Sequence, residues 1–141
     1  MPDKPATAGF IDTNVWLYAF VDAGEALKSA TARDLIRQSE PVVSTQIINE
    51  VCINLIKNTS LSEEQIAQLI ESFYQYRVVE LNKAILLSAS QLRKRYALSF
   101  WDSLVIASAL SAGVPVLYSE DMQHGLTVDR QLQILNPFIP R

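Results

Sequence analysis

Cysteine, long apolar runs and an excess of basic charge are all missing or scarce in this sequence of 141 residues. The single cysteine, Cys52, excludes a disulfide framework within the chain and fits a reducing compartment. Because Cys52 falls within an apolar helical stripe, we expect a buried and inert thiol there rather than a reactive one.

No apolar run approaches the roughly 18 residues that are needed to span a bilayer. The first five residues, Met-Pro-Asp-Lys-Pro, lack the apolar core of a signal peptide. We therefore expect a soluble, cytoplasmic protein with no membrane partner. The net charge of −3 argues against a protein that coats nucleic acid, which is usually basic, but it is compatible with one that acts on nucleic acid through a metal ion.

The composition that is present is that of a globular protein, with 49% hydrophobic and 19% charged residues. A chain of this length can bury a core as one domain. We find no internal repeat, linker or low-complexity segment. The sequence therefore predicts a single domain over residues 1–141, with residues 1–7 as a flexible tail.

Strand-like and helix-like segments alternate along the chain. Strands are predicted at 8–12, 42–44, 77–81, 115–119 and 133–136. Helices are predicted at 14–20, 24–40, 45–58, 82–97 and 99–112, and one more begins at a capping box, Ser62 to Gln65. Pro41 and Gly113 are placed to end two of them. This alternation predicts an α/β fold, with three layers (α/β/α) around a central, mostly parallel sheet.

Four acids fall where a strand ends or a helix begins. Asp12 ends the first strand and Asp121 lies just beyond the strand at 115–119, while Glu50 and Asp102 lie in early helix turns. In a parallel sheet these places can share one edge, so the four carboxylates can converge. Each also has a plain alternative: a helix cap for Asp12 and Asp102, a solvated helix face for Glu50, and a turn for Asp121.

Converging carboxylates repel one another unless a cation lies between them. A site made only of oxygen ligands favours Mg²⁺ or Mn²⁺ over zinc. With such ions, in-line attack of water on a phosphodiester is the natural chemistry.

Four segments carrying these acids resemble the motifs of the PIN-domain family, in the same order along the chain. They are Ile11-Asp12-Thr13-Asn14, Asn49-Glu50, Phe100-Trp101-Asp102-Ser103-Leu104 and Ser119-Glu120-Asp121. The match runs from about Phe10 to the C-terminus. Within the family, the chain is most similar to VapC-type toxins of bacterial toxin–antitoxin pairs, by its compact length and by residues 119–125 and 136–138.

The resemblance implies a Mg²⁺- or Mn²⁺-dependent endoribonuclease that leaves 5′-phosphate and 3′-hydroxyl ends. It implies that Asp12, Glu50, Asp102 and Asp121 bind metal, directly or through water, and that Asn14 and Ser119 orient these acids. It also implies an RNA substrate, a homodimer and an antitoxin partner whose C-terminal arm fills the active-site groove.

Three further features have two interpretations each. His124 can be a general acid–base group or, as we favour, a structural residue of its loop. The cluster Arg93-Lys94-Arg95 can bind RNA phosphate or simply end a helix, where basic residues are favoured. Trp16 and Trp101 can stack on bases, but both fit apolar stripes and we expect them in the core.

Other functions remain open. One is a PIN nuclease that processes RNA without an antitoxin, and another is a non-catalytic PIN-like interaction module. A phosphoacceptor receiver domain is also α/β with clustered acids. The receiver is disfavoured because the strand at 77–81 offers only Glu80, inside the strand, and no matching lysine follows the late strand.

Overall fold

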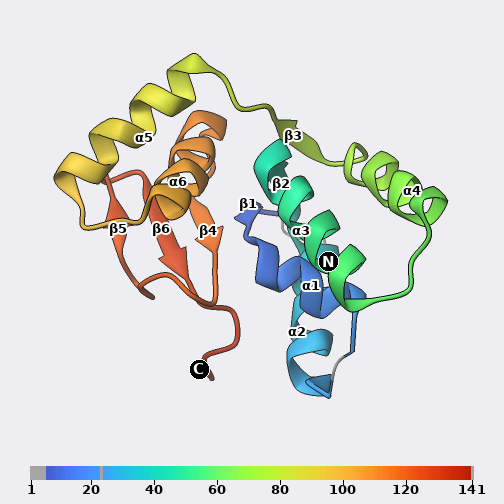
Figure 1. Ribbon diagram of the computed structural model, residues 1–141. Coiled ribbons are helices and arrows are strands. Elements are labelled where there is room, and N and C mark those ends of the chain that lie inside the picture. The colour runs from blue at the N-terminus through green and yellow to red at the C-terminus, as the bar shows by residue number, and fades with distance from the viewer. Residues whose placement is uncertain (1–5, 23, 141) are drawn as a thin grey trace. The chain divides into compact units, whose positions relative to one another are not determined.

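A computed structural model describes residues 6–22 and 24–140, and this part contains six helices and six strands (Figure 1). The described chain forms two compact units. One, the terminal unit, comprises the residues up to Pro41 together with those from Val114 onward, and the other, the central unit, comprises Val42–Gly113. The predicted α/β class with mostly parallel strands is confirmed, whereas a single domain over the whole chain stays a prediction.

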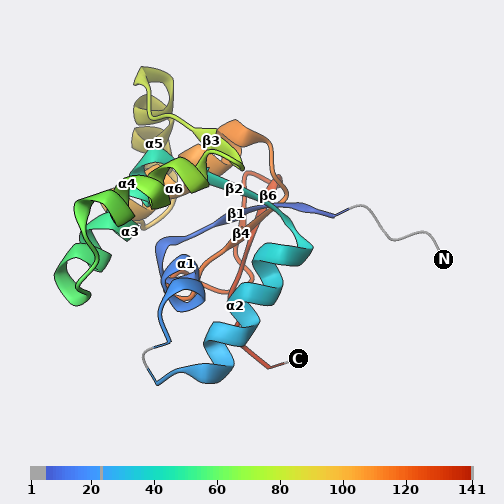
Figure 2. The same ribbon diagram turned by 90° about the vertical axis from the view of Figure 1, so that its right-hand side faces the viewer.

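The terminal unit is built on parallel strands. β1 (Ala8–Ile11) pairs in parallel with β4 (Val116–Tyr118), and β4 pairs in parallel with β6 (Leu132–Leu135). Figure 2 shows β1 next to β4. A two-residue strand, β5 (Thr127–Val128), adds to β6 in the antiparallel sense. The sequence did not predict β5, because two residues are too short for a periodic signal.

Two helices complete this unit, α1 (Thr13–Phe20) and α2 (Ala26–Gln38). Trp16 on α1 is buried, and its indole N–H donates to the Ile11 carbonyl at 3.0 Å, which confirms its predicted place in the core. Gly9 on β1 leaves room for the ring of Tyr118, because a Cβ at Gly9 would lie only 2.6 Å from Tyr118 Cε2. Of the predicted tail, residues 1–5 lie outside the described part, and the Thr7 carbonyl accepts a hydrogen bond from the Glu40 N–H.

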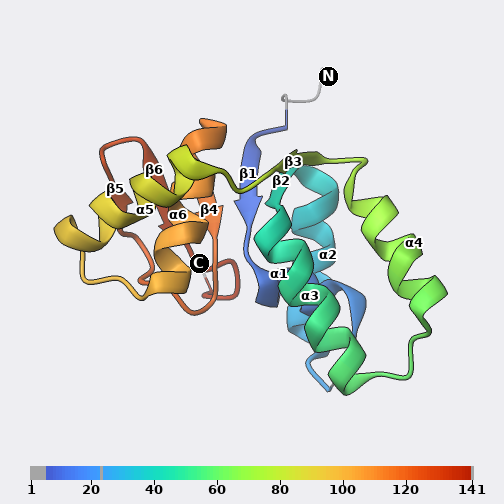
Figure 3. The ribbon, with the colours of Figure 1, turned by 45° about the horizontal axis from the view of Figure 1, so that its top comes forward.

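The central unit is mainly helical. β2 (Glu40–Ser44) pairs through Val42–Ser44 in parallel with β3 (Arg77–Val79). The helices are α3 (Thr45–Asn58), α4 (Glu63–Phe73), α5 (Lys83–Arg95) and α6 (Phe100–Ala112). α3 packs on α4, and α5 packs on α6 (Figure 3).

Local sequence signals explain where these helices begin and end. Ser62 and Gln65 form the predicted capping box of α4, with both hydrogen bonds present. α6 ends at Gly113, whose φ of 71° is a left-handed conformation that glycine adopts without strain. Cys52 is buried as predicted, and burial raises the pKa of its thiol, which fits an inert side chain.

The prediction that Trp101 lies in the core is wrong, since 44% of its surface is exposed. The burial of α6 begins at Ser103 and then includes every residue as far as Ala109. A helix buried on all sides carries no periodic signal of a buried face, so the sequence pattern could not show that the first turn of α6 lies outside the core. Among the described residues, no helix is long and apolar enough to cross a membrane.

Candidate active site

Asp12 lies at the junction of β1 and α1 and uses its two carboxylate oxygens differently. Oδ1 accepts a hydrogen bond from the Thr13 N–H at 2.8 Å, at the cap of α1. Oδ2 accepts from the Ser119 hydroxyl at 2.8 Å. The capping interpretation therefore accounts for only one oxygen, and a second element of the unit holds the other.

Ser119 reaches Asp12 because of the register of two adjacent strands. Ile11 on β1 is opposite Tyr118 on β4, and the Asp12 N–H donates to the Tyr118 carbonyl at 3.0 Å. The residues that follow these strands are consequently side by side at their carboxyl ends. Ser119 is buried, and its hydroxyl also accepts from the Met122 N–H at 3.3 Å, so it links the start of the loop to Asp12.

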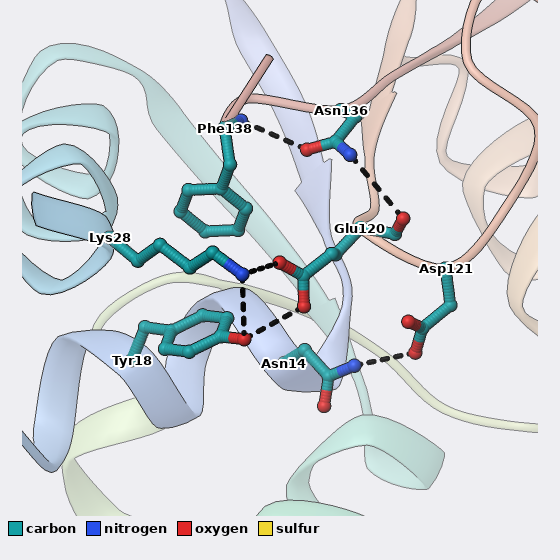
Figure 4. A network of polar contacts seen from close by, with 7 residues as sticks. All are labelled: Asn14, Tyr18, Lys28, Glu120, Asp121, Asn136 and Phe138. Atoms are coloured by element: carbon teal, nitrogen blue, oxygen red, sulfur yellow. Dashed lines mark hydrogen bonds and ion pairs between the residues drawn. The ribbon is translucent and has the colours of Figure 1, made fainter. Parts of the chain in front are cut away.

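Asp121 belongs to the same loop and is exposed. Its Oδ2 accepts a hydrogen bond from Asn14 Nδ2 at 2.5 Å (Figure 4). Asn14 is in the first turn of α1, two residues after Asp12. The terminal unit thus brings two of the four predicted acids, Asp12 and Asp121, to one edge of its sheet. Asp12 is bonded to Ser119 and Asp121 to Asn14, the two neutral side chains that the family resemblance implies as orienting groups.

The other two acids are on helices of the central unit. Glu50 is in the second turn of α3 and half-buried, and its backbone carbonyl accepts from Asn54 Nδ2 at 2.9 Å. Asp102 is in the first turn of α6, where its N–H donates to the Ser99 hydroxyl at 3.0 Å. Ser99 makes that cap, and within the described part of the chain the Asp102 carboxylate has no hydrogen bond or ion pair.

A buried glutamine connects the beginnings of these two helices. Gln46 in the first turn of α3 donates from Nε2 to the Trp101 carbonyl on α6 at 3.3 Å. Glu50 is one helical turn beyond Gln46, so the two share a face of α3. This places Glu50 and Asp102 on helix starts that are in direct contact.

The structure therefore describes two pairs of acids, one in each unit, and the meeting of the pairs stays a prediction. In neither unit do three or more described Asp, Glu, His or Cys side chains gather closely enough to hold a metal ion. A site of four acids needs both pairs.

The remaining predicted residues are engaged in local contacts. Arg93 on α5 donates to the Ser103 hydroxyl at 2.6 Å, and its guanidinium lies 4.4 Å from the centroid of the Phe100 ring. Lys94 and Arg95 are exposed in the last turn of α5. His124 Nδ1 accepts from the Asn136 N–H at 2.9 Å, which favours the structural role for this histidine.

A polar network beside Asp121 was not predicted from the sequence. The Glu120 carboxylate accepts from Tyr18 on α1 at 2.8 Å and from Lys28 on α2 at 2.6 Å (Figure 4). The hydrogen bond to Glu120 raises the pKa of Lys28, and burial is the main cause that raises the pKa of Tyr18. The one available signal was spacing, since Tyr18 is one turn beyond Asn14 on α1.

A family model described as the PIN domain matches residues 9–125, which include all four acids. The chain belongs to the PIN domain family. No curated protein sequence matches this PIN-domain chain.

Solved structures show the same fold at low sequence identity. A toxin–antitoxin complex from Klebsiella pneumoniae matches with a TM-score of 0.71 and 15% identity, covering 92% of this chain and 98% of that one. VapC20 from Mycobacterium tuberculosis, a toxin that cleaves the sarcin–ricin loop, matches with a TM-score of 0.65 and 21% identity over 80% of this chain and 89% of that one. VapBC2 from Rickettsia felis, bound to a fragment of promoter DNA, matches with a TM-score of 0.64 and 12% identity over 92% of this chain and 100% of that one.

Proposed function

We propose that this PIN-domain protein is an endoribonuclease that hydrolyses RNA phosphodiesters with the help of Mg²⁺ or Mn²⁺. The observation that carries the proposal is the pair of carboxylates, Asp12 and Asp121, at the ends of adjacent parallel strands. Ser119 donates a hydrogen bond to Asp12, and Asn14 donates one to Asp121. A helix cap and a loop turn alone do not require this arrangement.

The donor set fits a hard divalent cation. The acids offer only oxygen, and the side chains that orient Asp12 and Asp121, a hydroxyl and a carboxamide, carry no charge. We assign Asp12, Glu50, Asp102 and Asp121 as its ligands, directly or through water. Such a cation, when bound, takes up charge that develops on the phosphate and makes a coordinated water more acidic.

The surface beside Asp102 supports a single-stranded or looped RNA as substrate. Phe100 and Trp101, the two residues before Asp102, are 60% and 44% exposed. Exposed aromatic rings can stack on unpaired bases, and the basic residues Lys94 and Arg95 of the same unit can contact phosphate. Arg93 contributes by fixing the Phe100 ring.

We further propose that the protein is the toxin of a type II toxin–antitoxin pair, active as a homodimer and inhibited by an antitoxin. Support comes from the solved structures of similar fold, which include toxin–antitoxin complexes. An RNA-processing nuclease without an antitoxin is the alternative. A small gene for a DNA-binding protein next to this one, whose product co-purifies with the chain, would favour the toxin, and its absence would favour the processing enzyme.

The deciding experiment incubates the purified protein with structured and unstructured RNA, with Mn²⁺ or with EDTA. Asp12→Asn serves as the matched variant, because asparagine caps a helix as well as aspartate does. We expect cleavage that needs Mn²⁺ and is lost in the variant. Equal cleavage by both proteins would assign the activity to a contaminant, and Mn²⁺ binding without cleavage of any RNA would favour a non-catalytic module.

A further inference from the structure

Three consecutive residues after β4 are each bonded to the region around α1. Ser119 bonds to Asp12, the cap of α1, and Asp121 bonds to Asn14 in its first turn. Glu120, between them, bonds to Tyr18 one turn further along the same helix. The loop is therefore attached at three successive points to the cap and the first two turns of α1, and only the outer two involve residues assigned to the site.

The middle attachment differs from the other two because it includes an ion pair. Glu120 Oε1 accepts from the Tyr18 hydroxyl at 2.8 Å and Oε2 from Lys28 Nζ at 2.6 Å, so both oxygens are occupied. Lys28 also lies 3.4 Å from the Tyr18 hydroxyl. Charge-assisted hydrogen bonds of this kind are shorter and roughly twice as strong as neutral ones. The Lys28 and Glu120 side chains are only 34% and 19% exposed, so solvent screens the ion pair less than it would at the surface.

Two aromatic rings lie close to this ion pair, and a further hydrogen bond holds the main chain of Glu120. Lys28 Nζ lies 5.1 Å from the centroid of the Tyr18 ring and 5.7 Å from that of Phe138, and these two rings meet edge to face (Figure 4). On the backbone side, the Glu120 carbonyl accepts from Asn136 Nδ2 at 3.4 Å. Glu120 is thus held at both its side chain and its main chain. Because Asp121 is the next residue, the backbone that carries its carboxylate is held as well.

We propose that Lys28 and Tyr18 are positioning residues. They hold Glu120 in place, and this keeps the neighbouring Asp121 carboxylate positioned to bind the divalent cation. This inference rests on the proposed function, since it concerns the same site. Neither residue touches the acids of the site directly, and both act through the loop. Outer partners of this kind typically change metal affinity by about 10- to 100-fold when they are removed.

The test compares Lys28→Met with Arg37→Met. Both substitutions remove a cation from α2 that pairs with an acid, but Arg37 pairs with Asp34 on an exposed helix face and has no other hydrogen bond or ion pair among the described residues. Mn²⁺ binding is titrated by electron paramagnetic resonance, without RNA. We expect the Mn²⁺ dissociation constant to rise by about 10-fold in Lys28→Met and to stay unchanged in Arg37→Met. Equal affinity in Lys28→Met and the wild type would overturn the proposal.

A second measurement does not depend on metal or activity. Hydrogen exchange of the Met122 amide, which bonds to the Ser119 hydroxyl, reports on whether the loop is held. Exchange should be faster in Lys28→Met and Tyr18→Phe than in Arg37→Met, and the conservative Lys28→Arg should restore protection. Unchanged exchange would show that the network does not hold the loop.

These readouts separate the two proposals. If the wild type binds Mn²⁺ more tightly than Lys28→Met but cuts no RNA, the positioning role is supported and the proposed nuclease activity is contradicted. Should Lys28→Met fold poorly because it leaves Glu120 unpaired, the double variant Lys28→Met/Glu120→Gln removes both charges. The double variant is expected to recover the melting temperature and to keep the weak Mn²⁺ binding; recovery of both would overturn the proposal.

Discussion

The two units hold their candidate acids in different ways. In the terminal unit, Asp12 and Asp121 follow strands of one sheet, and each accepts a hydrogen bond from a neutral side chain more than 100 residues away in sequence. In the central unit, Glu50 and Asp102 are helix residues, and their helices are joined by the bond from Gln46 to the Trp101 carbonyl. The first pair is fixed at the carboxylates themselves, the second through the backbones that carry them.

This difference suggests a division of labour at the site. Carboxylates held by hydroxyl and amide donors are oriented before a cation arrives, so little ordering is lost on binding. The Asp102 carboxylate has no hydrogen bond or ion pair among the described residues, so we expect the cation or the substrate to order it. We therefore hypothesise that the terminal unit supplies a prepared part of the site and that Asp102 of the central unit supplies an adaptable one.

Removing one charge from either pair should have the largest effect. Asp12→Asn and Asp102→Asn are each expected to abolish metal-dependent cleavage while leaving the fold intact, because each removes a ligand and relieves repulsion between carboxylates. Cleavage assays beside circular dichroism melts check this. Wild-type cleavage by Asp102→Asn would restrict the site to the terminal unit.

Removing an orienting group should affect the prepared part more modestly. Ser119→Ala deletes the hydroxyl that bonds to Asp12 and is expected to lower cleavage by about 10- to 100-fold. Ser99→Ala, which removes the cap of α6 without touching a carboxylate, is the matched control in the other unit. Equal losses of activity in the two variants would mean that both pairs depend on local scaffolding to the same degree.

Divalent metal should stabilise the folded protein. Binding only to the assembled carboxylates adds about 2.7 kcal/mol when Mn²⁺ is present at about 100 times its dissociation constant, so the melting temperature should rise. The rise should vanish in Asp12→Asn and in Asp102→Asn if both units bind the ion. A melting temperature that is indifferent to Mn²⁺ in the wild type would count against the four-acid site.

The smallest expected effect concerns the cap of α1. Asp12→Ala removes the acceptor for the Thr13 N–H and should lower stability by about 1 kcal/mol, whereas Asp12→Asn should retain it. Chemical denaturation of both variants measures the difference. An identical loss of stability in both would mean that the negative charge, and not the cap, stabilises this junction.

The sequence carried enough information for most of the elements and for the shared sheet edge of the terminal unit. A buried strand that ends in Asp12, and a second that ends before Ser119, predicted a shared edge because parallel strands run in one direction. The strand register then confirmed it. Capping signals such as Ser62 to Gln65 were also sufficient, since a cap depends on neighbours in sequence.

Contacts that depend on three-dimensional packing escaped the sequence. The bond from Lys28 on α2 to Glu120 was not predicted, because nothing near Lys28 in sequence indicates that Glu120 lies opposite. Trp101 reads as core because it is apolar, yet the buried part of α6 begins two residues later, at Ser103. Both cases concern where a helix face points, which periodicity describes only relative to the helix itself.

The hydrogen bond between Asp12 and Ser119 spans 107 positions of the sequence, and this has a consequence for synthesis. β1 is synthesised long before β4, its parallel partner, and Asp121 follows β4 in the chain. Because chains are made from the N-terminus at about 5–20 residues per second, Asp12 and Asp121 can be brought together only after all residues between them have been synthesised. The pair in the terminal unit is therefore completed after the whole central unit, Val42–Gly113, has been made.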